Sequence, residues 1–114
     1  MQFFCYTLGV ETEEPPSMSP ESMAEMGRFV EEQTRRGVLI ATGGMGPLAD
    51  AIKVSYDGKD FRTTDGPFAE AKELVGGWAL INAPSKEAAI EETKKFLRLV
   101  GGGDITVRQV FGPE

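Results

Sequence analysis

The sequence predicts an α+β fold in which two helices lie against a sheet. Two stretches carry apolar residues at helical spacing, and each follows a serine that can cap a helix. Short runs of β-branched and aromatic residues lie between and around them, and Asp57-Gly58 joins two of these runs as a hairpin signal. The resulting order is strand, helix, strand, two hairpin strands, strand, helix, strand. This order is typical of a ferredoxin-like protomer, and 114 residues suit a single domain spanning residues 1–114.

Local signals set the boundaries of these elements. The first helix begins at Ser19-Pro20, because serine suits the N-cap and proline the first helical position, and it stops at Gly37. Ser85 caps the second helix. The expected strands are residues 2–8, 38–42, 52–56, 61–64, 75–82 and 105–111, and the expected helices are residues 20–36 and 86–100. The buried stripe expected on the first helix consists of Met23, Met26, Val30 and Thr34.

Both faces of the first strand are apolar. Phe3 and Cys5 point to one side, while Phe4 and Tyr6 point to the other. Two helices cover only one face of a sheet of this size, so a second subunit packed sheet to sheet would cover the other. We therefore expect a homodimer with two-fold symmetry. In the alternative, the chain is a monomer whose second face is partly covered by its own long loops.

The composition excludes several classes of function. The net charge is −6 and histidine is absent, so we expect no direct nucleic-acid binding. The single cysteine, Cys5, excludes an internal disulfide. Without histidine, neither a nucleophilic triad of the usual kind nor a transition-metal site is expected, and we expect no metal and no cofactor. No stretch approaches the roughly 18–20 apolar residues that span a bilayer, and no secretory signal is recognised, so the expected compartment is the cytoplasm.

Residues 64–81 read TDGPFAEAKELVGGWALI and contain the most organised motif of the chain. Gly66 and Pro67 constrain the backbone to a rigid turn, which Phe68 would anchor. Asp65 either caps backbone N–H groups of this turn or holds a carboxylate at the edge of a pocket, as a general base or a ligand anchor. Similarly, the glycine pair 76–77 either accommodates a neighbouring aromatic ring or leaves room for a ligand.

This stretch resembles the signature of the YCII-related family, in the branch named for its Asp-Gly-Pro-Phe motif. The common form there is DGPFAETKE, followed by a short spacer, two glycines, an aromatic residue and a hydrophobic strand. The matching residues here are Asp65, Gly66, Pro67, Phe68, Ala69, Glu70, Lys72, Glu73, Gly76, Gly77 and Trp78. The order of elements also fits along nearly the whole chain. The resemblance implies a dimeric α+β barrel, in which two ferredoxin-like protomers pair through their sheets.

The resemblance implies two kinds of function. The wider family is suspected to hold small-molecule enzymes with a histidine–aspartate pair, and one relative resembles a dehydrochlorinase of chlorinated aromatics. That pair cannot operate in a chain without histidine. The Asp-Gly-Pro-Phe branch also occurs near, or fused to, extracytoplasmic-function sigma factors. This association implies a non-catalytic sensor or protein-interaction module linked to transcription regulation.

The leading hypothesis is that the protein binds or transforms a small organic molecule, aromatic or hydroxylated, in a pocket near the Asp-Gly-Pro-Phe turn. If the protein is an enzyme, Asp65 is the expected acid–base group, and Arg62 or Lys72 would stabilise negative charge. The expected ligand-binding residues are Tyr6, Arg62, Phe68, Lys72 and Trp78.

Overall fold

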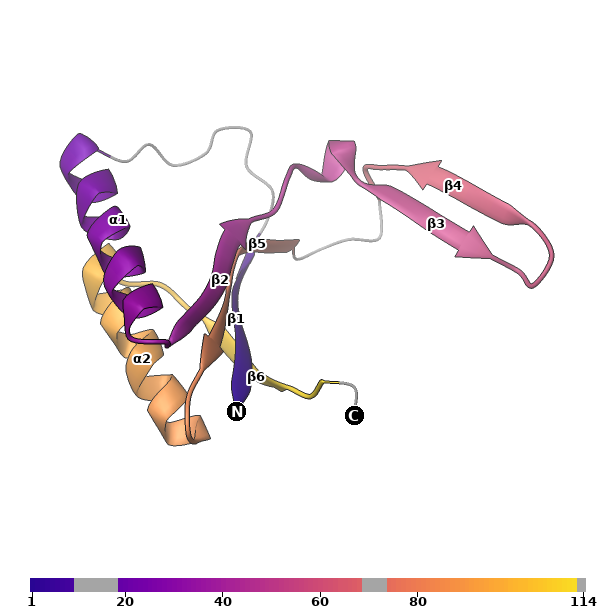
Figure 1. Ribbon diagram of the computed structural model, residues 1–114. Helices are drawn as coiled ribbons and strands as arrows, with labels where there is room; N and C mark the ends of the chain where they lie inside the picture. Colours follow the sequence, from indigo (N-terminus) through magenta and orange to yellow (C-terminus); the bar gives the residue numbers. More distant parts are fainter. Residues whose placement is uncertain (10–18, 69–73, 113–114) are drawn as a thin grey trace.

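The computed structural model describes residues 1–9, 19–68 and 74–112. Within these ranges the chain forms a four-stranded antiparallel sheet, two helices on one face of that sheet, and a separate two-stranded hairpin (Figure 1). The predicted α+β architecture is therefore confirmed.

The main sheet has the strand order β2-β5-β1-β6. Its strands are β1 (Gln2–Gly9), β2 (Leu39–Gly44), β5 (Leu74–Asn82) and β6 (Thr106–Val110). All three pairings are antiparallel, with Phe3 opposite Ile81 and Cys5 opposite Val107. The first and last strands of the chain thus lie side by side, and the two helices make the crossovers. This arrangement is compatible with a ferredoxin-like fold.

Serine caps start both helices, as predicted. At the start of α1 (Pro20–Arg35), the Ser19 hydroxyl accepts a hydrogen bond from the Ser22 N–H at 3.1 Å. At the start of α2 (Lys86–Val100), the Ser85 hydroxyl accepts one from the Ala88 N–H at 3.1 Å. The left-handed residue Gly101 (φ 89°) ends α2. These caps satisfy N–H groups that a helix leaves without internal partners.

The core lies between the sheet and α2. Phe3 and Cys5 of β1, Ile81 at the end of β5, and Ala89 of α2 are buried together, and Phe3 is only 2% exposed. Alternation along β1 places Phe3 and Cys5 on this helix-covered face and the residues between them on the other.

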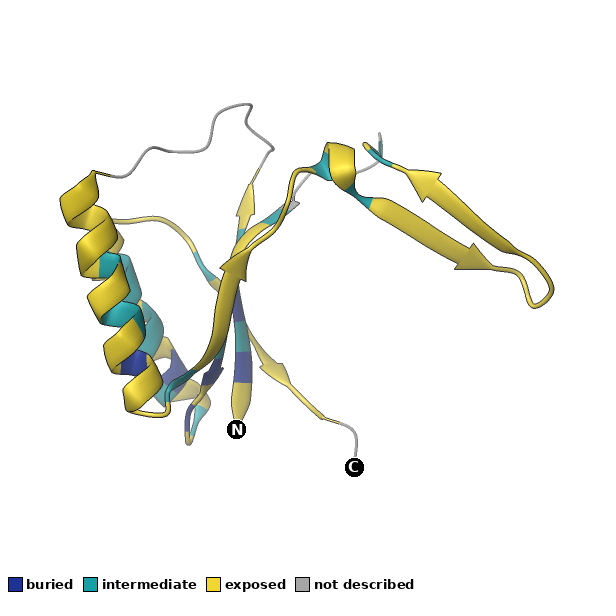
Figure 2. Cartoon of the chain, turned by 45° about the horizontal axis from the view of Figure 1, so that its top comes forward, coloured by how far each residue is buried: buried dark blue, intermediate teal, exposed yellow. Residues whose placement is uncertain are grey.

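The expected stripe on α1 is wrong at both ends. Met23 is 61% exposed and Thr34 is also exposed, whereas Gln33 is buried. Met23 is exposed because α1 approaches the sheet beside β2 at its C-terminal end and diverges from it toward its N-terminal end (Figures 1 and 2). Thr34 is exposed because the neighbouring residue Gln33 takes the inward position in the last turn. Only the residues near the C-terminal end of α1 therefore come within packing distance of the core.

The second sheet is a hairpin of β3 (Ile52–Tyr56) and β4 (Phe61–Asp65) that projects away from the main sheet (Figure 1). We call residues 52–65 the arm. The Asp57 carboxylate accepts hydrogen bonds from the N–H groups of Lys59 and Asp60 at 2.9 and 2.8 Å, which lowers the pKa of Asp57 and holds the predicted turn. A short 3-10 turn that the sequence did not predict, η1 (Leu48–Asp50), leads into the arm. Every residue of the arm is exposed (Figure 2).

Candidate functional site

A cavity of about 320 Å³ lies between the two helices and the sheet. Its walls come from α1, α2 and the helix-covered face of the sheet. Residues that line it include Met26, Phe29, Val30 and Gln33 of α1, Thr93 and Phe96 of α2, and Cys5, Thr42, Gly77 and Ala79 of the sheet. This space is where a fully packed α+β domain would have the outer part of its core.

The cavity exists because small residues face a helix that stands off the sheet. In the β2–β5 register, Thr42 lies opposite Ala79 and Gly44 opposite Gly77. These positions put no side chain larger than that of threonine into the layer that α1 leaves open. Of the glycine pair 76–77, Gly77 lines this cavity.

The neighbouring aromatic ring packs on a different glycine. A methyl group added at Gly43 would lie 3.2 Å from the Trp78 ring, on the face of the sheet away from the helices. Gly76 instead lies close to the Thr7 hydroxyl: a methyl group added at Gly76 would lie 3.1 Å from the Thr7 hydroxyl oxygen. The close approach expected of glycine 76–77 therefore occurs, but its partner is a threonine and not an aromatic side chain.

Most polar groups in the cavity wall are satisfied by the protein. The hydroxyls of Thr42 and Thr93 donate to the carbonyls of Trp78 and Ala89 at 2.8 and 2.9 Å. The Cys5 sulfur lies 4.0 Å from the Thr93 hydroxyl, and burial raises the pKa of the Cys5 thiol. The wall therefore offers mainly apolar surface, and its thiol is a poor nucleophile at neutral pH.

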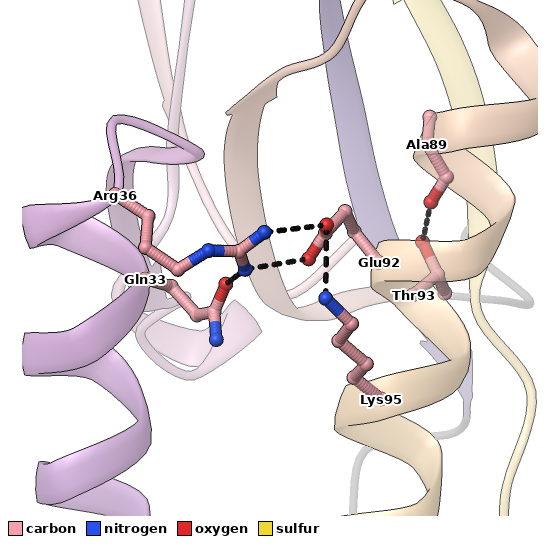
Figure 3. Close-up of polar contacts among 6 residues, drawn as sticks. All are labelled: Gln33, Arg36, Ala89, Glu92, Thr93 and Lys95. Atoms are coloured by element: carbon pink, nitrogen blue, oxygen red, sulfur yellow. Dashed lines mark hydrogen bonds and ion pairs between the residues drawn. The ribbon is translucent and has the colours of Figure 1, made fainter.

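A charged cluster joins α1 to α2 beside the cavity (Figure 3). The Arg36 guanidinium donates to both Glu92 carboxylate oxygens at 3.4 Å, and Lys95 donates to the same carboxylate at 3.1 Å. Burial alone would raise the pKa of Glu92, but the hydrogen bonds and positive charges of Lys95 and Arg36 outweigh it and lower that pKa. Glu92 is thus a paired carboxylate and a weak base.

Gln33 is the one buried polar side chain among the described residues. Its amide oxygen accepts a hydrogen bond from Arg36 at 2.6 Å, which orients the amide group (Figure 3). No hydrogen bond to a described residue uses its amide nitrogen. Because Gln33 lines the cavity, its side-chain amide belongs to the few polar groups of the wall.

The structure separates the sequence-predicted site residues into two groups. Tyr6 and Trp78 are opposite each other in the β1–β5 register and border the cavity. Their rings, however, belong to the sheet face away from the helices, where Phe4 lies 5.4 Å from Tyr6 and 6.0 Å from Trp78 between ring centroids. Lys72 lies outside the described residues.

The other group lies at the arm and does not line the cavity. Asp65 ends β4, Arg62 is exposed within it, and the Lys53 ammonium lies 4.8 Å from the centroid of the Phe68 ring. The Asp65 carboxylate accepts no hydrogen bond from a described residue, so the capping role is not observed. The turn is closed instead by the Gly66 N–H, which donates to the Ala51 carbonyl at 2.8 Å.

Gly66 is required at the base of the arm. A methyl group at this position would overlap the carbonyl oxygen of Leu48 in η1 and lie 3.3 Å from that of Ala51. The chain passes from Gly66 to Pro67 through a cis peptide bond. The Asp-Gly-Pro-Phe turn therefore clasps the end of the arm against the segment that leads into it.

Sequence reasoning placed Met26 and Val30 on a buried stripe and Tyr6 and Trp78 at a ligand site, but it missed Gln33 and the cavity that these residues line. Met26, Val30 and Gln33 follow helical spacing, so a glutamine at the end of an apolar stripe was the available signal. Because Thr34 was assigned to that stripe, the neighbouring residue Gln33 was not recognised as part of it. The cavity itself depends on the distance between α1 and the sheet, which periodicity does not encode.

The described part of the chain, residues 1–9, 19–68 and 74–112, shows neither a membrane-spanning helix nor a metal-binding cluster. No helix there is long and apolar enough to cross a membrane. Likewise, no three histidine, cysteine or carboxylate side chains of residues 1–9, 19–68 and 74–112 gather as a metal site.

The fold and the cavity define an α+β protein with ferredoxin-like strand order and a ligand-sized space between its layers. The family model of the YCII-related domain matches residues 1–111, and the chain belongs to this family. A comparison with curated proteins found no match.

Proposed function

We propose that the protein binds a small, uncharged and largely apolar organic molecule in the cavity between the helices and the sheet. The observation that carries this proposal is the cavity itself, whose wall is apolar and whose polar groups are mostly paired with the protein. Ligand pockets typically measure about 300–1,000 Å³ and combine apolar walls with a few oriented polar groups. Here Gln33 supplies such a group.

The volume sets the size of the ligand. A cavity of about 150 Å³ accommodates benzene. The 320 Å³ found here is roughly twice as large and therefore suits a molecule of about two fused rings.

The electrostatics of the cavity wall determine which ligand charge it accepts. Glu92, the carboxylate in the wall, is already paired with Arg36 and Lys95, so neither a cation nor an anion finds a free partner in the wall. Transferring an unpaired charge into such a site is costly. A neutral molecule with one hydrogen-bond acceptor matches the Gln33 amide nitrogen.

The chemistry of the wall favours binding over catalysis. The Cys5 pKa is raised by burial, and the Glu92 carboxylate is tied by two cations. This fits a non-catalytic role, which is one part of the alternative that the Asp-Gly-Pro-Phe branch implies; the link to transcription regulation rests on the resemblance alone. An acid–base role for Asp65, assisted by Arg62 or Lys72, would require a second site at the base of the arm, separate from the cavity.

We propose in addition that two protomers form a dimeric α+β barrel in the cytoplasm, paired through the sheet faces that carry Phe4, Tyr6 and Trp78. Both helices lie on the opposite side, which leaves this aromatic face uncovered by described residues (Figure 1). Packing against the same face of a second subunit would remove it from water.

A thermal-shift experiment with three matched probes tests the binding proposal. Naphthalene and quinoline have the same shape, but quinoline adds one acceptor nitrogen, while 1-naphthoate adds a negative charge. We expect quinoline and naphthalene to raise the melting temperature and 1-naphthoate not to do so. At a hundred times its dissociation constant, a ligand adds about 2.7 kcal/mol. Gln33→Met should remove the preference for quinoline, worth about 0.5–1.5 kcal/mol.

Filling the cavity provides the control. Ala79→Leu places a larger side chain in the wall, whereas Ala24→Leu makes the same change on the exposed side of α1. Only Ala79→Leu should abolish the shifts. A shift that survives in a folded Ala79→Leu variant, or an equal shift with 1-naphthoate, would overturn the proposal.

A further inference from the structure

The arm has an apolar face that its own chain leaves in solvent. Ile52, Val54, Tyr56 and Phe61 are 58–75% exposed, and the rings of Tyr56 and Phe61 stack at 4.4 Å between centroids. Cross-strand partners share a face, so the pairings Tyr56–Phe61, Val54–Thr63 and Ile52–Asp65 place all of these residues on one side of the hairpin. We call this side the apolar face of the arm.

The opposite side of the arm is polar. It carries Lys53, Ser55, Arg62 and Thr64, which alternate with the apolar residues along the two strands. Such alternation is typical of a strand with one face in solvent and one face packed. An isolated two-stranded hairpin is marginally stable in water, and no residue of 1–9, 19–68 or 74–112 outside the hairpin covers this apolar face.

A second uncovered apolar face lies on the main sheet. It contains Phe4, Tyr6, Trp78 and Leu80, which occupy the face turned away from the helices. The arm does not cover this face of its own sheet, because it projects away from the body (Figure 1). Its base is fixed by the hydrogen bond from Gly66 to Ala51 and by the close approach of Gly66 to Leu48.

The two faces have complementary charges. Asp65 lies on the apolar face of the arm because it pairs with Ile52, and it is the single formal charge on that face. Arg108 lies on the open sheet face because it pairs with Phe4, and it is the single formal charge among the described residues of that face. Otherwise each face presents apolar or neutral side chains, which suits burial of one against the other.

We propose that each arm packs its apolar face on the β6 edge of the open sheet face of a second copy of this chain, beside the contact between the two sheets, with Asp65 directed toward Arg108 of the partner subunit. Two-fold symmetry makes the contact reciprocal, so the arm of each protomer contacts the sheet of the other. The inference rests on the proposed homodimer and assigns to the arm a part in forming it.

A pair of neighbouring substitutions tests the role of the arm. Val54→Asp places a charge on the apolar face, and Ser55→Asp places the same charge on the polar face one residue away. Sedimentation equilibrium should show a dimer for the wild type and for Ser55→Asp. For Val54→Asp the dissociation constant should rise by roughly a hundredfold or more, since the dimer would bury an unpaired carboxylate.

The outcomes separate this inference from the proposed dimer. If Val54→Asp dimerises as tightly as the wild type, the arm is not part of the interface and the homodimer stands. If the wild type is monomeric at high concentration, both proposals fail. Circular dichroism establishes that the variants fold. If Val54→Asp does not fold, Phe61→Ser replaces it as the variant that makes the apolar face of the arm polar.

A charge exchange tests the direction of packing. Asp65→Arg and Arg108→Asp should each weaken the dimer, because like charges would then face each other. The double variant should restore tighter association than either single variant. A double variant that associates no better than the singles would overturn the placement of Asp65 against the partner's Arg108.

Discussion

Strands β1 and β3 both carry apolar residues at alternate positions, but those of β1 are buried in the folded chain and those of β3 are exposed. Phe3 and Cys5 of β1 are buried beneath α2, whereas Ile52 and Val54 of β3 are exposed along the arm. Alternation of apolar residues indicates that a face is to be covered. It does not indicate whether the cover comes from the same chain, from a ligand or from a second molecule.

The largest expected effect separates these two fates. Phe3→Ala removes a ring that is 2% exposed, and it should lower the free energy of unfolding by about 3–5 kcal/mol. Phe61→Ala, at a residue 75% exposed, should cost within about 0.5 kcal/mol in dilute protein. Urea denaturation at low and high protein concentration measures both. If the cost of Phe61→Ala is as large as that of Phe3→Ala at low concentration, the contrast between body and arm is wrong.

The joint between body and arm should respond next. Gly66→Ala forces a methyl group onto the Leu48 carbonyl, so we expect about 1–3 kcal/mol of local destabilisation. Gly46→Ala, where an added methyl meets no atom within 4 Å, is the matched control and should leave stability unchanged or slightly raised. Hydrogen exchange of the arm amides is the measurement. Equal protection in both variants would contradict the clasp.

Acid should weaken the contact between the helices of the body, and it should also weaken the turn of the arm, where Asp57 likewise has a lowered pKa. The pKa of Glu92 is lower in the folded chain than its ordinary value of 4.5. Its stabilising contribution is therefore present above pH 4.5 and is lost as the pH falls through the folded-state pKa. Because Arg36 and Lys95 are partly exposed, the contribution should stay below about 1 kcal/mol.

Glu92→Gln should flatten the loss of stability on acidification, measured by urea denaturation at neutral and acidic pH. Glu91→Gln is the control, since Glu91 and Lys94 are both more than half exposed. The assignment fails if both variants retain the wild-type dependence on pH.

The smallest expected effect concerns Asp65 in the isolated protomer. Asp65→Asn removes an exposed carboxylate that no described residue hydrogen-bonds, so stability should change by less than about 0.5 kcal/mol. The shift produced by quinoline should also be unchanged, because Asp65 does not line the cavity. Loss of that shift in folded Asp65→Asn would return the ligand site to the Asp-Gly-Pro-Phe turn.

The sequence predicted most of the fold because the signals are local. Ser19 and Ser85 mark the helix starts through hydrogen bonds that span three residues, and Asp57-Gly58 encodes its own turn. The site was much less predictable. Asp65 and Trp78 belong to one short motif, yet they lie on the arm and on the main sheet, in two different environments.

By itself, therefore, the sequence determined the order of helices and strands, the caps, the hairpin turn and the alternation of faces, since each depends on neighbours along the chain. Only the tertiary structure decided that α1 stands off the sheet, that Gln33 lines a cavity with Gly77 and Ala79, and that the arm points away from the body. These features depend on distances between elements far apart in sequence, which packing sets and local residue preferences do not.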